Sequence, residues 1–545
     1  MTVFLCLYLM KNLRHMKKTI LFILILFCEF AIAQETVGLV YSDINETKAD
    51  GYTLFNTLSD DRVYLINNCG EVVNQWDFSG KNSKQSYLLE NGNLWQSDQE
   101  TADIRDWDNN VIWSVEFNSL GFRIHHDIAP LPNGNFLLLI RDTYTDVEML
   151  AQGKDTSFDG SRFVLDKIIE IEPVGTNSAN IVWEWKFFDH LIQQFDSSKP
   201  NFGSISANPQ LLDMNYEAFN SVDYTHGNGI DYNADLDQIM ISARHTSEIY
   251  VIDHSTTTAQ AASNSGGIYG KGGDFLWRWG NPAVYDSGTA ANQTLGKQHD
   301  AKWITDGIHK GKISVFSNDA YGTDLSASSA HIIEPNDVDG VYNLDKGKFS
   351  PEDYFWSYNG TILGEILREN SRSGVQIMPN GNALINETNK GRISEVDSSG
   401  KVIWVYKIPI SGGTTFDQYT KEIADNGSFR ATRYPENYVG FDGLTIVSSG
   451  IIENENSISA NCAKLLSVDN LYFSDLRVYP NPTKDWLNFN FNKPIDQIKV
   501  YDIYGKIVLT QTNAELVNLE SLANGLYVVK ILSGGSTDSL KIIKN

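Results

Sequence analysis

The sequence predicts an all-β protein, a six-bladed β-propeller followed by a small C-terminal β-sandwich. First, a pattern of strand, Asn-Gly turn, two further strands and a last strand with tryptophan recurs six times. Second, one copy takes roughly 35 to 50 residues or more, the length of a propeller blade. Third, the pattern stops near residue 450, where short alternating strands of another kind begin. The chain has 545 residues, 41% of them hydrophobic, which is ample for two such cores.

Residues 1–33 are expected to be an upstream extension and a signal peptide. From Met16, "MKKTILFILILFCEFAIAQ" carries two lysines, a short apolar run and an Ala-x-Ala site. This order is typical of a secretory signal and predicts cleavage after Ala33. An upstream start codon would account for the fifteen residues before Met16. Whether translation starts at Met1 or at Met16 stays open.

Cysteine usage agrees with an exported chain. Cys6 lies in the extension and Cys28 in the signal, so the mature protein keeps only Cys69 and Cys462. Two thiols in an oxidising compartment could pair. The sequence does not show whether they meet in space, so this disulfide is left open.

Residues 34–449 are expected to form the propeller. Each four-stranded sheet would bury its faces against its neighbours, and the recurring tryptophan would pack between blades. The first copy shows only three clear strands, so we expect the segment around "FRATRYPENY" to supply the missing strand and close the ring. The six copies occupy residues 51–78, 86–117, 125–187, 226–282, 298–360 and 373–408.

Residues 450–470 read as a polar linker and residues 471–545 as a compact set of alternating strands, a β-sandwich by pattern. This last segment resembles the C-terminal sorting domain of the type IX secretion system in its "YPNP" opening and its "VYDIYGKIV" and "LANGLYVVKI" strands. The resemblance implies the type IX machinery as a partner and a secreted or cell-surface, outer membrane-associated location.

Charge and missing motifs exclude several classes of function. The formal net charge is -25 and the pI is near 4.7, whereas a nucleic-acid partner needs a basic face. No apolar run after the signal reaches spanning length, so we expect no integral membrane segment in the mature chain. There is no G-x-S-x-G elbow, P-loop, Rossmann fingerprint or CxxC pair, so no nucleotide cofactor is expected.

Three histidines occupy one repeat-equivalent position. His126, His226 and His299 each lie seven residues before the first turn of their copy, where the second and sixth copies carry Lys84 and Ser373. Innermost strands surround the channel of a propeller, so these side chains would converge on one axial pocket. A single histidine is most simply a core residue, but three in register favour a site.

Arg244 strengthens the prediction of a site for a tetrahedral oxyanion. Imidazoles and a guanidinium are fixed donors that suit sulfate or phosphate. If residues 238–245 form a strand, Arg244 and His245 cannot both point into the channel. Three histidines could ligate zinc, but the arginine would repel a cation, so no metal is expected.

Other polar residues are interpreted as structural. The loop "DYNADLD" is spaced like the start of a calcium loop but lacks the required glycine and has Ser242 at position twelve, which favours a polar turn. Four further histidines have no repeat-equivalent partner: His190, on an expected helical insertion, His254, His309 and His331.

Over roughly residues 50–440 the chain resembles the bacterial arylsulfate sulfotransferase family, which are six-bladed propeller enzymes. The carrying segments are "HHDIAPLPNGNFLLL", "THGNGIDYNADLDQIMISARH" and "GKQHDAKWITDG". The resemblance implies His299 as nucleophile, with His226 and Arg244 binding the sulfuryl group. The first segment supplies a further sulfate-binding histidine; the blade register selects His126, and its neighbour His125 stays an alternative.

The implied activity is ping-pong transfer of a sulfuryl group from an aryl sulfate to a phenol through sulfohistidine, with no nucleotide donor or metal. Better-known members carry an N-terminal strand domain and use it in dimerisation, whereas only about 15 residues separate the expected signal from the first copy here. Dimerisation by that route is therefore not expected, and the oligomeric state stays open. The insertion at residues 186–222 is expected to shape the entrance. Two alternatives remain: a non-catalytic surface propeller that binds sulfated or acidic glycans, and an aryl-sulfate hydrolase. The natural donor and acceptor stay open.

Overall fold

The structure is a computed structural model that divides into two compact units, Met1–Asn456 and Ser457–Asn545. The predicted signal segment, Cys6, Cys28 and Lys84 lie outside the residues that the structure describes. The described residues are 36–43, 46, 48–78, 85–156, 158, 160, 162–220, 222–320, 327–459, 462, 476–502, 506–533 and 536–545.

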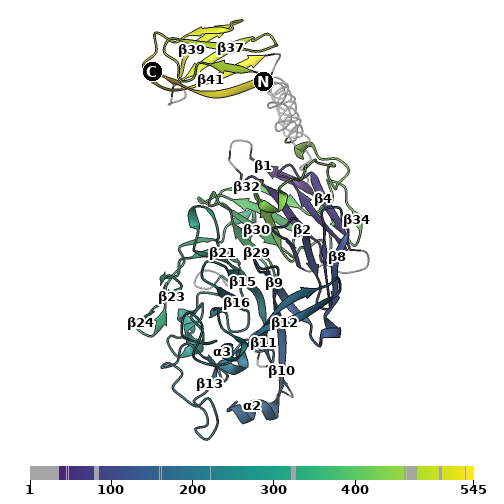
Figure 1. Ribbon diagram of the computed structural model, residues 1–545, viewed down its shortest axis with the longest axis vertical. Coiled ribbons are helices and arrows are strands. Elements are labelled where there is room, and N and C mark those ends of the chain that lie inside the picture. The colour runs from purple at the N-terminus through teal and green to yellow at the C-terminus, as the bar shows by residue number, and fades with distance from the viewer. Residues whose placement is uncertain are drawn as a thin grey trace, which may run out of the picture. The chain divides into compact units, whose positions relative to one another are not determined.

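The first unit is built from antiparallel meander sheets, one for each copy of the sequence pattern (Figure 1). The all-β fold is confirmed. In five copies the four strands come from one continuous segment, because short turns favour antiparallel neighbours. The second sheet consists of β5 (Gln85–Leu88), β6 (Leu94–Ser97), β7 (Thr101–Arg105) and β8 (Val111–Glu116), and the third of β9 (Ile124–Pro130), β10 (Phe136–Thr145), β11 (Arg162–Val174) and β12 (Ser178–Lys186). The fourth consists of β15 (Gly227–Asn233), β16 (Gln238–Ala243), β17 (Glu248–Asp253) and β18 (Trp277–Trp279), and the fifth of β19 (His299–Trp303), β20 (Ile313–Ser317), β21 (Ser329–Ile333) and β26 (Trp356–Tyr358). The sixth consists of β29 (Gly374–Ile377), β30 (Ala383–Glu387), β31 (Arg392–Val396) and β32 (Val402–Lys407).

The first copy has three strands of its own, β2 (Tyr52–Asn56), β3 (Arg62–Ile66) and β4 (Val72–Asp77). Its innermost strand is β35 (Ala431–Tyr434), which pairs with β2 from the far end of the unit. The expected closing strand is therefore confirmed. The sequence pattern did not reveal β1 (Gly38–Ser42), which pairs with β32 as a fifth strand of the last sheet.

Tryptophans tie each sheet to the next, which confirms their predicted packing role. In each sheet, a tryptophan of the fourth strand donates its indole N–H to a backbone carbonyl of the next sheet at 2.8 to 3.1 Å. The carbonyl lies between the third and fourth strands of that sheet or at the start of its fourth strand. The last of these bonds returns to the first sheet and closes the series. The pairs are Trp76 with Asp106, Trp113 with Ser178, Trp183 with Thr256, Trp277 with Ser350, Trp356 with Ser398, and Trp404 with Asn68.

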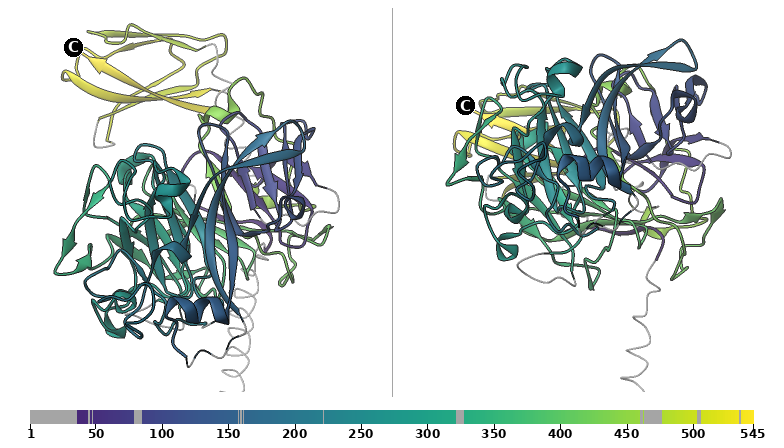
Figure 2. Two further views of the ribbon diagram at one scale, coloured as in Figure 1. Left: turned by 60° about the horizontal axis from the view of Figure 1, so that its bottom comes forward. Right: turned by 90° about the horizontal axis from the view of Figure 1, so that it is seen from below.

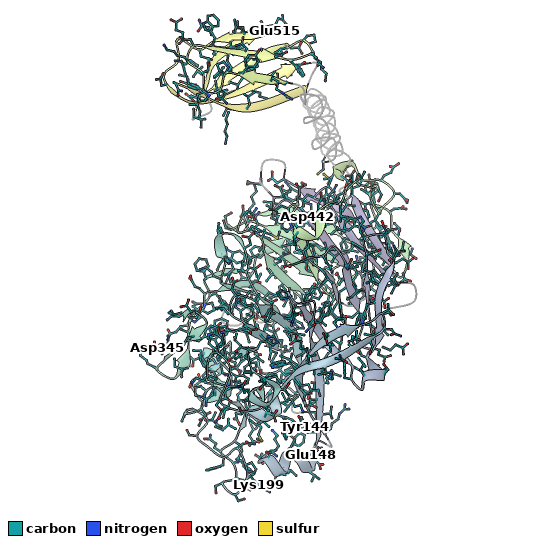
Figure 3. The ribbon with its side chains drawn as sticks, viewed as in Figure 1. Tyr144, Glu148, Lys199, Asp345, Asp442 and Glu515 are labelled. Carbon is teal, nitrogen blue, oxygen red and sulfur yellow. The ribbon has the colours of Figure 1, made fainter. Side chains whose placement is uncertain are left out.

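Insertions enlarge one side of the ring. β10 and β11 form a long hairpin, blue in Figure 2, that runs to α2 (Asp146–Gln152). Figure 3 places Tyr144 near the end of β10 beside Glu148 of α2. The segment of His190 is not the expected helix but one 3-10 turn, η2 (Phe187–His190), followed by a short strand. The other short elements are η1 (Phe117–Leu120), β13 (Leu191–Ile192), β14 (Leu212–Asp213), α3 (Thr258–Ala261), η3 (Pro282–Tyr285), η4 (Ala290–Asn292), η5 (Gly307–His309), β22 (Asp337–Val338), β23 (Val341–Tyr342), β24 (Leu344–Asp345), β25 (Lys348–Phe349), β27 (Thr361–Ile362), β28 (Glu365–Ile366), β33 (Ile410–Ser411), β34 (Thr414–Thr415) and η6 (Val439–Phe441).

The second unit holds two antiparallel sheets around one apolar core that includes Leu487, Val500 and Val529. Apolar side chains alternate along these strands, as a half-buried sheet requires. One sheet consists of β36 (Arg477–Tyr479), β37 (Trp486–Asn490) and β40 (Leu516–Asn518), and the other of β38 (Gln497–Tyr501), β39 (Ile507–Thr512), β41 (Gly525–Ser533) and β42 (Ser536–Lys544).

Two further observations concern the cysteines and the helices. Cys69 and Cys462 are each disulfide-bonded. Every helix among the described residues is too short or too polar to span a bilayer.

Candidate active site

The predicted histidines stand where three neighbouring innermost strands begin. His126 lies in β9, His226 directly precedes β15, and His299 opens β19. All three strands are interrupted there by a β-bulge or register shift. A bulge re-aims side chains and is typical of the rim of an active site.

The bulges hold non-glycine residues at positive φ. The φ values are 72° at His126, 46° at His226 and 57° at Asp300, next to His299. A left-handed backbone costs such residues about 1–3 kcal/mol, so the surrounding fold has to impose it. Such strain is common at functional sites, and two of the predicted histidines have it, although left-handed residues also occur in turns elsewhere in the chain.

His126 and His226 face each other across the two sheets. Their Nε2 atoms are 3.2 Å apart, and the rings lie 5.0 Å apart between centroids. His125 also belongs to this group, because its ring lies 4.4 Å from that of His126 and 5.0 Å from that of His226. The blade register had selected His126 over His125, and the structure brings both to the cluster.

Each of two rings is oriented by a carboxylate. His125 Nδ1 lies 2.6 Å from Asp166 Oδ1, and His226 Nδ1 lies 2.7 Å from Asp223 Oδ2. Burial raises the pKa of Asp223, but the hydrogen bond and charge of His226 outweigh it and lower that pKa to about 2. Both carboxylates therefore accept from Nδ1–H, which leaves Nε2 of each ring facing the cluster.

The strand argument about Arg244 was wrong. β16 ends at Ala243, so Arg244 and His245 lie beyond the strand and the alternation of faces does not apply. Arg244 donates from Nη1 to His245 Nε2 at 2.8 Å. The His245 ring in turn lies 4.4 Å from that of His226. Burial lowers the pKa of His245 to about 4, so it is a neutral acceptor that orients the guanidinium.

His299 is buried, with 4% of its surface exposed, and both ring nitrogens are engaged. Nδ1 lies 2.6 Å from Asn318 Oδ1 and 3.1 Å from the Lys297 carbonyl. Both are acceptors, so Nδ1 carries the proton and Nε2 the lone pair. In agreement, Nε2 accepts the backbone N–H of Arg372 at 3.1 Å.

Burial, and then the charge of Arg430, hold the pKa of His299 well below its usual range. The charge of Arg244 acts in the same direction. The imidazole is therefore neutral near pH 7 and offers a lone pair on Nε2.

The repeat pattern in the sequence did not predict the residues that orient the site histidines. Asp223, Asn318 and Arg372 follow no repeat, since each makes a contact that depends on folding. Arg430 comes from the closing segment; it is 7% exposed, donates to the Ser373 and Asn228 carbonyls, and has its Nε 2.9 Å from Asp300 Oδ1. An arginine in the segment needed to close the ring was the one available signal.

An aromatic side chain of the insertion borders the cationic groups. Phe219 is 62% exposed, and its ring lies 5.3 Å from the Arg244 guanidinium carbon and 4.5 Å from the Lys297 ammonium. The ring also lies 5.3 Å from that of His245. The insertion thus contributes one exposed aromatic side chain beside Arg244; its role at an entrance stays a prediction.

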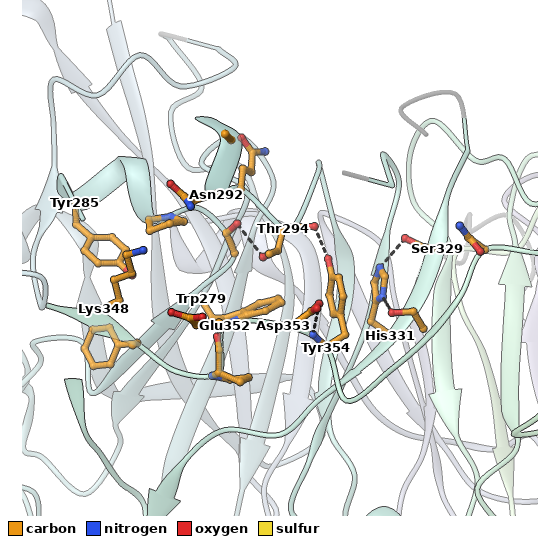
Figure 4. Close-up of a pocket in the computed structure, with 18 residues that line it drawn as sticks. Trp279, Tyr285, Asn292, Thr294, Ser329, His331, Lys348, Glu352, Asp353 and Tyr354 are labelled. Carbon is orange, nitrogen blue, oxygen red and sulfur yellow. Dashed lines mark hydrogen bonds between the residues drawn. The ribbon is translucent and has the colours of Figure 1, made fainter. Parts of the chain in front are cut away.

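A separate cavity of about 620 Å³ lies between the fourth and fifth sheets (Figure 4). None of the predicted site residues lines it. At its base, His331 is held between the Ser329 and Ser357 hydroxyls and stacks on Tyr354 at 3.6 Å. Two other histidines also have structural contacts, His190 with Asp274 and His254 with Asp237 and Glu170. Asn233 accepts two turn N–H groups, so "DYNADLD" is the predicted polar turn.

Two groups of described side chains have spacing that could hold a metal ion: His125, His126 and His226, and Asp223, His226 and His245.

Two family models match the chain. The model for Arylsulfotransferase (ASST) matches residues 41–331, just over half of the chain. The model for the secretion system C-terminal sorting domain matches residues 477–545, which indicates export and attachment at the cell surface. No curated protein matches the sequence.

Several solved structures are similar at low identity. One is a protein of unknown function from Bacteroides caccae, with 13% identity, coverage of 66% of this chain and 94% of that chain, and a TM-score of 0.36. The β-propeller domain of Cps50 (Swd1) from Myceliophteria thermophila has 11% identity, coverage of 70% and 91%, and a TM-score of 0.33. Virginiamycin B lyase from Staphylococcus aureus has 12% identity, coverage of 69% and 89%, and a TM-score of 0.29. Likeness at this level supports no statement about function.

Proposed function

Since this chain belongs to the arylsulfotransferase family and has a sulfotransferase-like function, we propose that it moves a sulfuryl group from an aryl sulfate to a phenol with His299 as nucleophile. The observation that carries the proposal is the tautomer of His299. Two acceptors hold its Nδ1–H, so the lone pair stands on Nε2 of a buried, neutral ring. A neutral imidazole with a directed lone pair is a competent nucleophile.

In the first step, the Nε2 lone pair attacks sulfur and the bond from sulfur to the aryl oxygen breaks. The phenolate leaves with the bonding electrons and takes a proton from solvent. His299 then carries the sulfuryl group on Nε2 and a proton on Nδ1, so its ring is cationic. Asn318 Oδ1 and the Lys297 carbonyl stabilise that charge through the Nδ1–H hydrogen bonds.

In the second step, an acceptor phenolate oxygen attacks the same sulfur and the Nε2–S bond breaks. The imidazole recovers its lone pair, and the acceptor leaves as a new aryl sulfate. In the structure, Nε2 accepts the Arg372 N–H. We propose that substrate displaces this contact, which the positive φ of Arg372 (56°) and Ser373 (70°) makes easier to give up.

We assign the sulfuryl oxygens to Arg244, His126 and His226. Arg244 is held by His245, so a guanidinium is preorganised beside the histidine cluster. The Asp223 carboxylate accepts the Nδ1–H of His226 and so fixes the orientation of that ring beside the sulfuryl position. Phe219 provides an exposed aromatic face for the aryl ring of donor or acceptor.

The test incubates the full mature chain with 4-nitrophenyl sulfate, with and without phenol, and follows nitrophenol and phenyl sulfate. We expect nitrophenol release that depends on phenol and disappears in His299→Ala, while the thermal midpoint stays near that of the wild type. Mass spectrometry without acceptor should find one SO₃ group on His299. Turnover retained in His299→Ala would reject the nucleophile.

The same assay separates the alternatives. Release without any acceptor, at the same rate as with phenol, would identify an aryl-sulfate hydrolase. Tight binding of sulfated or acidic glycans without any release across a panel of aryl sulfates would identify a non-catalytic propeller.

A further inference from the structure

The rings of His125, His126 and His226 bring three nitrogen atoms close together. One ligand atom from each lies within 4.8 Å of the others. A tetrahedral metal with bonds of about 2.0–2.1 Å to imidazole sets its nitrogen ligands about 3.3 Å apart. The 3.2 Å between Nε2 of His126 and Nε2 of His226 already matches this spacing.

The protonation states also suit a metal. His125 and His226 give their Nδ1 protons to Asp166 and Asp223, so their Nε2 atoms carry lone pairs. Nε2 of His125, in a side chain that is 1% exposed, has no hydrogen-bond partner among the described residues.

Two of the three rings have the outer partner that metal-binding histidines use. A ligating histidine nearly always donates its other ring N–H to a carboxylate, a carbonyl or water, which fixes its orientation. Asp166 is itself held by the Thr225 hydroxyl and the Gly227 N–H. Asp223 is approached by Arg141 at 3.5 Å.

The local charge does not oppose a cation. Arg244 repels a cation, but Asp166 and Asp223, which bond His125 and His226, attract one. Two carboxylates offset the two guanidinium groups of Arg141 and Arg244. The second candidate set is less suitable, because both ring nitrogens of His245 are engaged, Nε2 with Arg244 and Nδ1 with the Asp223 carbonyl.

We propose that His125, His126 and His226 form a tridentate site for Zn²⁺, with water in the fourth position. Because His126 and His226 are also assigned to the sulfuryl group, bound zinc excludes the aryl sulfate and inhibits transfer. The inhibition rests on the proposed function, whereas zinc binding by itself does not.

Zinc binding is tested on the full mature chain after removal of metal with EDTA and of the EDTA by dialysis. Calorimetric titration with ZnCl₂ should give one site per chain, and Co²⁺ should give the visible absorption of a tetrahedral nitrogen-ligated ion. His125→Ala and His226→Ala should each weaken binding by at least about tenfold. His245→Ala is the matched control and should leave zinc affinity within about threefold.

Several results would overturn the site. The first is a calorimetric titration that detects no zinc binding. The second is an unchanged zinc affinity in the double variant His125→Ala, His226→Ala. The third is loss of zinc binding in His245→Ala alone. Circular dichroism checks that each variant folds. If His125→Ala does not fold, His125→Asn replaces it.

The inhibition is tested with 4-nitrophenyl sulfate as the varied substrate. Zinc should raise KM without lowering kcat, and EDTA should restore the original KM. In His125→Ala, the zinc concentration that halves the remaining activity should rise in parallel with the zinc Kd. Zinc that binds at this site and leaves KM unchanged, or stimulates turnover, would reject the inhibition but keep the metal site. A protein without transferase activity would reject the proposed function and leave the calorimetry to decide the site.

Discussion

Asn318 offers the sharpest test of how His299 is activated, through the Asn318→Ala substitution. Its Oδ1 accepts the Nδ1–H of His299 at 2.6 Å, and its Nδ2 donates to the carbonyls of Glu369 and Arg372. This one buried amide therefore fixes the tautomer of His299 and holds the segment that covers Nε2.

The expected loss follows from the charge that forms on His299 as sulfur bonds to Nε2. A hydrogen bond to a charged group contributes about 1.5–3 kcal/mol, which corresponds to roughly 10- to 150-fold in rate. The Lys297 carbonyl remains as a second acceptor at 3.1 Å, so we expect the lower end, about tenfold in kcat/KM.

Asn318→Asp should act differently. A carboxylate at the same position favours the imidazolium and raises the pKa of His299, whereas in the wild type this pKa lies well below its usual range. The wild-type activity should therefore hold as the pH falls through about 6.5. The variant should lose activity over that range, because its nucleophile becomes protonated.

The assay is kcat/KM for 4-nitrophenyl sulfate with phenol, measured from acidic to neutral pH alongside thermal unfolding. Asn382→Ala is the matched control, since it removes another buried amide, bonded to Glu395 at 2.7 Å. It should cost comparable stability and leave kcat/KM unchanged. Unchanged kcat/KM in Asn318→Ala, or an equal loss in Asn382→Ala, would refute the reasoning.

Three further outcomes test the entrance, the ring closure and the pH dependence of stability. Phe219→Ala should raise KM for 4-nitrophenyl sulfate roughly 2- to 12-fold, since aromatic pairs contribute about 0.5–1.5 kcal/mol, while the thermal midpoint hardly moves; an unchanged KM would remove Phe219 from the site. Trp404→Ala should cost about 3–5 kcal/mol in unfolding free energy and Trp404→Phe clearly less, because Trp404 is fully buried and links the last sheet to the first; equal losses would contradict a packing role. Burial lowers the pKa of His331 to about 3, below its unfolded value near 6.5, so its stabilisation is present above pH 6.5 and is lost as the pH falls towards 3, by at most about 5 kcal/mol. Denaturant unfolding of His331→Gln should show a flatter decline over that range, and an unchanged slope would exclude His331 as the source.

Much of the fold could be read from the chain because it follows local periodicity. Strand alternation, Asn-Gly turns and the tryptophan at the end of each copy are short-range features, and each of the six copies forms its own sheet. The number of blades stays a prediction made from those copies. β1 was missed because a fifth outer strand leaves no mark on the repeat.

The candidate site could be predicted only in part. His126, His226 and His299 were found because one repeat position carries an unusual residue type three times. The same register selected His126 and left His125 as an alternative, and the structure brings both rings to the cluster. The role of Arg244 stays a prediction; the strand premise used for it does not apply, since β16 ends at Ala243.

By itself, the sequence determined the strands, the recurring tryptophans and the three histidines in register, since these depend on the order and spacing of residue types along the chain. Only the tertiary structure decided what each histidine can do. Asp223, Asn318 and Arg372 set the tautomers of His226 and His299, and the charge of Arg430, in the segment that closes the ring, helps to lower the pKa of His299. The physical reason is that a proton on one ring nitrogen is placed by contacts between distant segments, which no local pattern encodes.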